Sequence, residues 1–128
     1  MLEHTGITVT DLDHSKTFYG KALAPLGIDL VMEVTAEQTG AEAHAGFGTG
    51  GKPSFWIGSG PRPSGPVHFA FSAASRPDVD AFYRSALAAG GKDNGPPGIR
   101  PHFHASYYAA FVLDPDGNNI EAVCHKPG

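Results

Sequence analysis

The chain has 128 residues, of which 41% are hydrophobic and 17% are charged, and its formal net charge is −4. These values fit one small folded domain. Nine basic residues are scattered among thirteen acidic ones, which excludes a basic stripe for nucleic acid, and no run of about eighteen apolar residues is available to span a membrane.

The N-terminus and the cysteine content bear on the compartment. Residues Met1 to His4 lack the basic and apolar regions of a secretory signal. Cys124 is the single cysteine of the chain, so no internal disulfide can form. We expect a cytoplasmic protein in which Cys124 is a small buried side chain without a catalytic role.

The first half of the chain predicts the order β-α-β-β-β. Residues 3–10 alternate between two faces, as in a half-buried strand. Residues 11–26 carry apolar side chains at helical spacing, with Asp11 or Asp13 as the expected cap and Gly27 at the end. Three strands are then expected, at residues 28–34, 42–47 and 53–57.

The second half predicts the same order after a connector at residues 59–65. Residues 67–73 predict a strand, and Ser75 to Asp78 resembles a capping box before a helix that stops at Gly90 and Gly91. Residues 92–98 consist of turn-forming residues, so a loop is expected there. Strands are expected at residues 99–105, 107–113 and 118–125, with a turn at residues 114–117 joining the last two.

A step of 64 residues relates the two halves. It carries His4 onto His68, and it matches a further set of residues in the two predicted helices: Phe18, Tyr19, Ala22, Leu23, Ala24 and Gly27 onto Phe82, Tyr83, Ala86, Leu87, Ala88 and Gly91. The chain is therefore expected to contain two modules, residues 1–60 and 61–128, within one domain. Such a duplication places His4 and His68 near a pseudo-twofold axis, where one added carboxylate would complete a metal site.

The two ends of the chain resemble those of a known superfamily. Residues 2–12, with the helix after them, and above all the segment Phe111-Val-Leu-Asp-Pro-Asp-Gly-Asn-Asn-Ile-Glu121 resemble the vicinal oxygen chelate superfamily. This superfamily includes glyoxalase I, extradiol dioxygenases, bleomycin-resistance proteins and fosfomycin-resistance thiol transferases. The resemblance implies an α+β fold, in which two tandem βαβββ modules form a half-open curved sheet around a metal held by His4, His68 and Glu121.

Departures from the subfamily patterns narrow the expected activity. The 64-residue step projects Glu121 onto Ile57, and no carboxylate occurs from Lys52 to Arg62. Glyoxalase I typically uses four protein ligands, so this departure weighs against its reaction. Phe111 stands where the extradiol dioxygenases and the fosfomycin enzymes usually have a tyrosine, and Gly6 stands where the fosfomycin enzymes have a threonine. Phe111 weighs against classical catechol cleavage, and Phe111 and Gly6 together weigh against fosfomycin resistance.

Residues 98–108 are dense in side chains that titrate or donate hydrogen bonds. On a strand, His102 and His104 would share one face, where either one is a candidate general base or acid. Tyr107 or Tyr108 would orient a bound oxygen. We therefore predict His102, His104 and Tyr108 as catalytic residues, while a surface strand for the two histidines and a packing role for the tyrosines remain alternatives.

The expected ligand set favours one metal and one reaction class. Two histidines and one carboxylate suit Fe(II) best, although Mn(II), Ni(II), Co(II) and Zn(II) also fit. We predict a non-haem Fe(II) dioxygenase or other oxygenase that acts on a small phenolic or vicinal dioxygenated molecule. The alternatives are a metal-dependent isomerase or lyase of the glyoxalase type, and a resistance protein that binds a drug or natural product without turnover.

The resemblance also implies an assembly. Single-domain members of the superfamily often pair a module from each of two chains around every metal. We expect a homodimer with two shared sites, in which His4 comes from one subunit and His68 and Glu121 come from the other.

Overall fold

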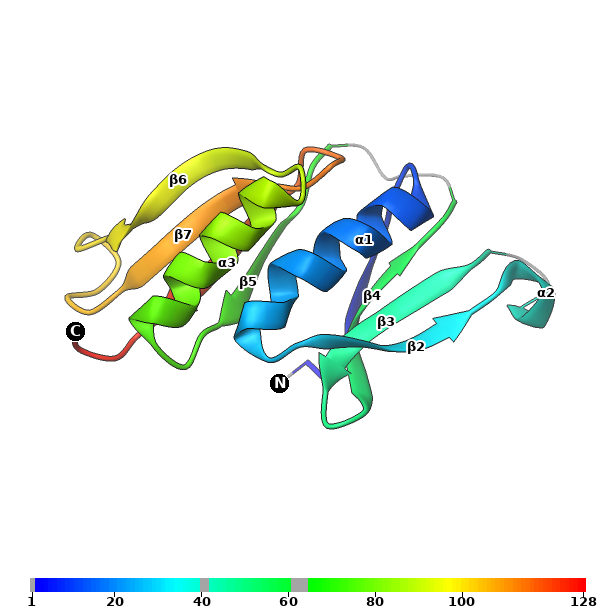
Figure 1. Ribbon diagram of the computed structural model, residues 1–128, viewed down its shortest axis with the longest axis horizontal. Helices are drawn as coiled ribbons and strands as arrows, with labels where there is room; N and C mark the ends of the chain where they lie inside the picture. The colour runs from blue at the N-terminus through cyan, green and yellow to red at the C-terminus, as the bar shows by residue number, and fades with distance from the viewer. Residues whose placement is uncertain (1, 40–41, 61–64) are drawn as a thin grey trace.

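The computed structural model describes residues 2–39, 42–60 and 65–128. It contains two four-stranded sheets, with strand orders β1-β4-β3-β2 and β5-β8-β7-β6, and two long helices that lie side by side on one side of them (Figure 1). The predicted α+β class and the two tandem modules are confirmed. The expected module boundary at residue 60 borders residues 61–64, which lie outside the described residues.

Module one follows the predicted order, with one added helical turn. Its elements are β1 (Thr5–Thr8), α1 (Leu12–Leu23), a short 3-10 helix (Ala24–Leu26), β2 (Asp29–Val34), α2 (Ala36–Thr39), β3 (His44–Thr49) and β4 (Lys52–Gly58). β1 runs parallel to β4, and the other neighbours are antiparallel. Of the two predicted caps, Asp11 and Asp13, it is Asp11 that caps α1, because its side chain accepts a hydrogen bond from the His14 amide at 3.1 Å.

Module two repeats this pairing. Its elements are β5 (His68–Ser72), α3 (Arg76–Ala88), β6 (Lys92–Ile99), β7 (Tyr108–Leu113) and β8 (Asn119–Cys124). β5 runs parallel to β8, and the other neighbours are antiparallel. Ser75 caps α3 by accepting a hydrogen bond from the Asp78 amide at 3.3 Å, in agreement with the capping box.

The structure differs from the prediction between the helix and β7. Residues 92–98, expected to be a loop, form most of β6, and the expected strand at 99–105 is wrong. β6 is the outer strand of its sheet, where the missing N–H groups of Pro96 and Pro97 are tolerated. A loop follows instead of a strand, and the Arg100 amide donates to the Tyr107 carbonyl at 2.8 Å across its ends.

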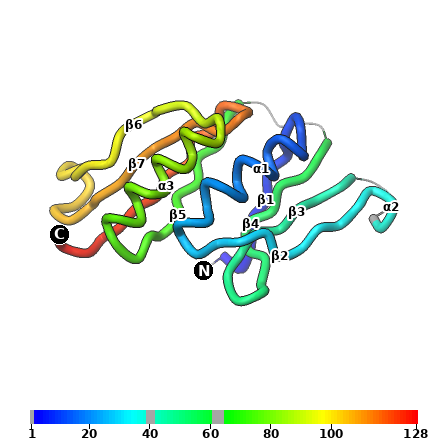
Figure 2. The backbone as a smooth tube through the Cα atoms, viewed as in Figure 1, coloured from blue at the N-terminus to red at the C-terminus, as the bar shows by residue number. Residues whose placement is uncertain are grey.

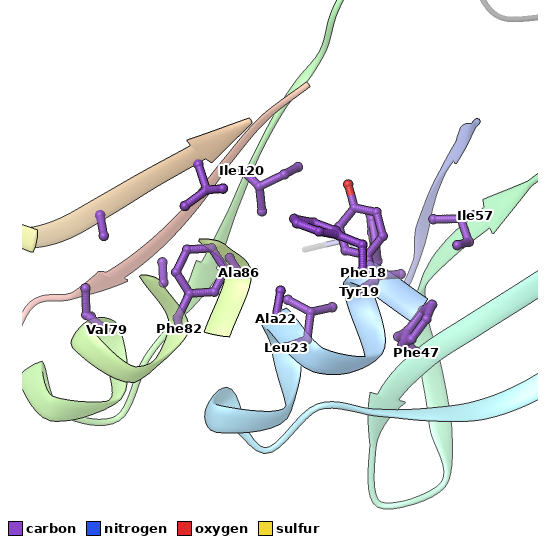
Figure 3. Close-up of a cluster of buried hydrophobic side chains, with 14 of the residues drawn as sticks. Phe18, Tyr19, Ala22, Leu23, Phe47, Ile57, Val79, Phe82, Ala86 and Ile120 are labelled. Atoms are coloured by element: carbon purple, nitrogen blue, oxygen red, sulfur yellow. The ribbon is translucent and has the colours of Figure 1, made fainter. Parts of the chain in front are cut away.

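The hydrophobic core lies between the two helices and the sheets. Figure 3 shows buried residues of both helices next to strand residues from both modules: Phe18, Tyr19, Ala22 and Leu23 of α1, Val79, Phe82 and Ala86 of α3, and Phe47, Ile57 and Ile120 of the strands. Phe55 of β4 joins the modules, since its ring centroid lies 5.5 Å from that of Phe69 and 5.2 Å from that of Phe71 on β5. The two modules therefore share one core.

The turn between β7 and β8 ties module two to module one. Asp114, which is 4% exposed, accepts hydrogen bonds from the Asn118 amide at 2.8 Å and from the Tyr19 hydroxyl at 2.5 Å. Asp116 accepts from the Thr10 amide at 3.2 Å. The motif that carries the family resemblance is thus, apart from Glu121, a structural connection between the modules.

One side of each sheet faces the helices, and we call the other side the open face. In the backbone trace of Figure 2, β1 and β5 run in the middle of the molecule, while β2 and β6 form its outer edges. Successive side chains of a strand project to opposite sides. Ile120 and Ala122 belong to the core, so Glu121 between them projects to the open face.

Candidate metal centre

His68 and Glu121 meet on the open face of module two. β5 and β8 are parallel, and their register sets Ala70 opposite Glu121. His68, two residues before Ala70, projects to the same side. Its Nε2 atom lies 2.9 Å from Oε1 of Glu121, so the structure brings together two of the three predicted metal ligands.

Glu121 is buried although no helix covers the open face of the sheet. Its side chain is 2% exposed, whereas that of His68 is 51% exposed. A buried carboxylate is costly unless it is hydrogen-bonded, and here the second oxygen, Oε2, accepts a hydrogen bond from the Tyr107 hydroxyl. Burial and this hydrogen bond raise the pKa of Tyr107 to about 12, so the phenol remains a donor at neutral pH.

Within one folded chain, the side chain of His4 is separate from the His68–Glu121 pair. It precedes β1, its side chain is 59% exposed, and its Nδ1 lies 2.5 Å from Oε1 of Glu3. It lines a cavity of about 750 Å³ together with Lys52 and Trp56. Within residues 2–39, 42–60 and 65–128, no three His, Cys, Asp or Glu side chains are grouped closely enough to hold a metal ion.

Strand register identifies the module-one counterpart of Glu121. Glu121 stands opposite Ala70, two residues after His68, and the residue opposite Gly6, two residues after His4, is Trp56. The projection onto Ile57 is therefore wrong by one residue. Ile57 is 0% exposed and belongs to the core, whereas Trp56 projects to the open face. Neither residue is a carboxylate, so module one supplies no counterpart to Glu121.

Trp56 forms a wall of the module-one open face. It lines the 750 Å³ cavity and a second one of about 400 Å³, which His44 also borders. Its ring lies across Gly46 of β3, where an added Cβ would sit 3.0 Å from Cη2 and Cζ3 of the indole. The absence of a side chain at Gly46 thus permits this placement of the ring.

His102 and His104 do not share a strand face. Both lie in the exposed loop after β6, so the predicted alternation does not apply to them. Nδ1 of His104 accepts a hydrogen bond from the Ser106 amide at 3.0 Å. The ring of His104 lies 5.9 Å from that of His125, which in turn lies 5.1 Å from the ring of Tyr107.

The two adjacent tyrosines project to opposite sides. Tyr108 packs against the core, and its hydroxyl donates to Oδ1 of Asp80 at 2.6 Å, away from Glu121. Tyr107 is the tyrosine whose hydroxyl reaches Glu121. Phe111 pairs with Glu121, and alternation back from Phe111 through Ala109 places Tyr107, rather than Tyr108, on the side of Glu121.

The donor chemistry of the pair fits a divalent metal. An imidazole nitrogen and a carboxylate oxygen lie side by side on rigid strands, and Tyr107 orients the carboxylate through its other oxygen. A catalytic site of this kind needs a further protein ligand and open positions for substrate. His4 is the remaining candidate of the expected set.

Comparisons with known proteins agree with this architecture. The model of the Glyoxalase/Bleomycin resistance protein/Dioxygenase superfamily matches residues 1–122. A glyoxalase/bleomycin resistance protein from Albidiferax ferrireducens T118 is 30% identical over 99% of both chains, with a TM-score of 0.78. A glyoxalase/bleomycin resistance protein/dioxygenase family enzyme from Burkholderia phytofirmans PsJN is 18% identical over 97% of this chain and 98% of its own, with a TM-score of 0.71.

A longer protein shares the fold as well. A glyoxalase I mutant from Zea mays is 22% identical over 99% of this chain but 45% of its own length, with a TM-score of 0.72. No curated protein sequence matches the chain. In the part of the chain that the structure describes, no helix is long and apolar enough to cross a membrane. The family match over residues 1–122 and the shared fold show that the chain belongs to the Glyoxalase/Bleomycin resistance protein/Dioxygenase superfamily.

Proposed function

We propose that the chain is a metal-dependent enzyme whose metal is held by His68 and Glu121 together with His4 of a second copy. The observation that carries this proposal is the His68–Glu121 pair, in which a 2% exposed carboxylate lies 2.9 Å from an imidazole nitrogen. Buried, oriented acids beside histidines are typical of metal sites. Members of this superfamily typically bind divalent metals, which supports the same conclusion.

The separation of His4 from the pair supports a shared site. Within the described residues, the three side chains do not form one group, and His4 lines a cavity of module one. In an isologous dimer, the open face of module one in each chain faces that of module two in the other, which generates two equal sites. Each site then contains Trp56 from the chain that supplies His4.

Each residue has a defined task in this proposal. His4, His68 and Glu121 hold the metal, and Tyr107 keeps the carboxylate of Glu121 oriented through its hydroxyl. The rings of Trp56 and Phe111 exclude water from the bound substrate. His102 and His104, on the exposed loop after β6, are proposed to move a proton at the substrate when it is bound. Tyr108, bonded to Asp80 on the helix side, is proposed to act indirectly by holding β7 against α3.

We propose Fe(II) as the metal and oxygenation of a small phenolic or vicinal dioxygenated molecule as the reaction. Fe(II), when bound, supplies Lewis acidity and one-electron chemistry toward dioxygen. The three-ligand set supports this choice, because Trp56 replaces the carboxylate that a four-ligand isomerase site would have at this position. Two histidines and a carboxylate on one side of a metal leave the remaining positions for small molecules.

The test combines metal analysis with oxygen uptake. The wild type and Glu121→Ala are purified under nitrogen, and their metal content is measured by plasma mass spectrometry. About one iron per chain in the wild type and its loss in the variant are expected. The iron-loaded wild type should then consume oxygen when catechols or related phenols are added.

Other results of these experiments would support one of the two alternative functions. Turnover of a substrate without oxygen would identify an isomerase or lyase. Tight binding of small aromatic molecules by both proteins, without metal and without turnover, would identify a binding protein and contradict the metal-dependent enzyme.

A further inference from the structure

A row of four residues crosses the open face of module two from the candidate metal site to the outer edge. Strand register pairs Ala70 with Glu121, Glu121 with Phe111, and Phe111 with Gly95. Directly paired residues on neighbouring strands project to the same side of a sheet. The ring of Phe111 therefore lies beside the metal-binding pair, and its centroid is 6.4 Å from that of His68.

The side chain of Arg100 lies over the far end of this row, beside Gly95 and Phe111. Its Cζ atom lies 5.4 Å from the centroid of Phe111, which places the guanidinium over the ring. Nη2 donates a hydrogen bond to the Pro96 carbonyl at 2.6 Å. A Cβ at Gly95 would lie 3.2 Å from Nη2, and one at Gly98 would lie 3.0 Å from Nη1. The glycines thus leave room for the guanidinium, while the ring and the carbonyl hold it in place.

The charge of Arg100 is not neutralised by the described residues. None of their carboxylates lies within ion-pair distance of it, whereas Lys16, for comparison, lies 2.6 Å from Glu33. A guanidinium has five N–H donors, and its hydrogen bond to Pro96 uses one of them. Its planar fork matches the two oxygens of a carboxylate. Arg100 is therefore a half-buried cation on the same face as His68 and Glu121, with donors left for an anion.

We infer that the substrate is an aromatic acid whose carboxylate binds Arg100 while its vicinal oxygens face His68 and Glu121. This inference rests on the proposed function and narrows its substrate class. The aromatic ring of such a molecule lies over Phe111, which separates the cation from the metal-binding pair. Arg100 acts as a specificity-determining residue: it selects a charged substrate over a neutral one with the same chelating oxygens.

Two probes that differ in charge test the inference. 3,4-Dihydroxybenzoate and 3,4-dihydroxybenzamide share the chelating oxygens and an electron-withdrawing substituent, but only the first is anionic at that substituent. Their dissociation constants are measured by calorimetry on protein loaded with Zn(II), which prevents oxidation during the titration. We expect the wild type to bind the benzoate about tenfold more tightly than the benzamide.

Three variants separate recognition from folding. Arg100→Gln should bind both probes with equal affinity, and its benzamide dissociation constant, zinc content and melting temperature should equal those of the wild type. Arg100→Lys, which keeps the charge but loses the fork, should retain part of the preference. The matched control is Arg84→Gln, because Arg84 is exposed on α3 on the other side of the sheet, and it should keep the full preference.

The outcomes distinguish failure of the proposed role of Arg100 from failure of the proposed metal site. Equal affinity of the wild type for the two probes, failure of zinc-loaded protein to bind either of them, or a preference that survives in Arg100→Gln would overturn the role of Arg100 and leave the metal site intact. Failure of the wild type to take up zinc in the first step would overturn the proposed function itself, and the inference with it.

Discussion

The hydroxyl of Tyr19 in α1 donates a hydrogen bond of 2.5 Å to Oδ2 of Asp114 at the end of β7. The two residues belong to different modules, and both are buried. Asp114 also accepts hydrogen bonds from the Asn118 amide at 2.8 Å and from the Asp116 amide at 2.9 Å. One carboxylate therefore organises its own turn and fastens it to the first helix.

Loss of this connection should destabilise the whole domain. Tyr19→Phe leaves a buried carboxylate short of one donor, and we expect it to lower the free energy of unfolding by about 1.5–3 kcal/mol. Asp114→Ala leaves several donors unpaired and should cost about 3 kcal/mol or more. Urea unfolding followed by circular dichroism measures both. Asp13→Ala is the control, because the Asp13 side chain is 94% exposed, and its effect should stay below about 0.5 kcal/mol. Wild-type stability of Tyr19→Phe would contradict this account.

The same tyrosine predicts a loss of stability at high pH. Burial and the nearby Asp114 raise the pKa of Tyr19 well above its ordinary value of 10.0. The folded chain therefore keeps this proton after the unfolded chain has lost it, so the contribution is full below pH 10 and falls as the pH rises further. Urea unfolding at about pH 9 and about pH 11 should show a smaller decline for Tyr19→Phe than for the wild type. Equal declines would show that Tyr19 is not the group responsible.

The position of Trp56 depends on a missing side chain. At Gly46, a Cβ would lie 2.8 Å from Cβ of Pro53 and 3.0 Å from the indole ring. We expect Gly46→Ala to displace the ring, to red-shift the emission of this single tryptophan and to cost about 1–3 kcal/mol. Gly20→Ala in α1 is the control, since nothing lies within 4 Å of its added Cβ, and it should leave the emission unchanged while stabilising the helix. An unchanged spectrum of Gly46→Ala would contradict the close contact.

The shared site predicts complementation between inactive chains. His4→Ala and Glu121→Ala homodimers should each lack both sites. Mixed chains should form heterodimers with one complete site, so a statistical mixture should recover about a quarter of the wild-type metal content per chain. Metal analysis after mixing, unfolding and refolding measures this recovery. Refolding each variant alone is the control, and a mixture that binds no more metal than the separate variants would contradict the shared site.

Much of the fold could be predicted because it depends on local patterns. The helix caps Asp11 and Ser75 and the 64-residue step are visible in the sequence, and the structure confirms the two modules that they predict. β6 could not be predicted in the same way. Its Pro96 and Pro97 are signals of a turn, and only their location on an outer strand, which is a tertiary property, makes them compatible with a sheet.

The candidate site was predictable in its residue types but less so in its geometry. Glu121 and His68 were expected together, and their side chains lie 2.9 Å apart. The counterpart of Glu121 was missed by one residue, because the 64-residue step does not hold through the loops that precede β4 and β8, whereas strand pairing identifies Trp56 directly. Tyr107 directly precedes β7, and alternation back from Phe111 in the strand predicted at residues 107–113 already favours it over Tyr108 on the side of Glu121.

The two prolines of β6 have a further consequence, for aggregation. An outer strand normally offers a row of free N–H and C=O groups to which a strand of another molecule can add. Pro96 and Pro97 leave two successive positions of β6 without an N–H donor, and the pairing of β6 with β7 is irregular on both sides of Gly95. The outer edge of module two is therefore a poor template for a foreign strand, so concentrated protein is protected there against growth of the sheet from one molecule into the next.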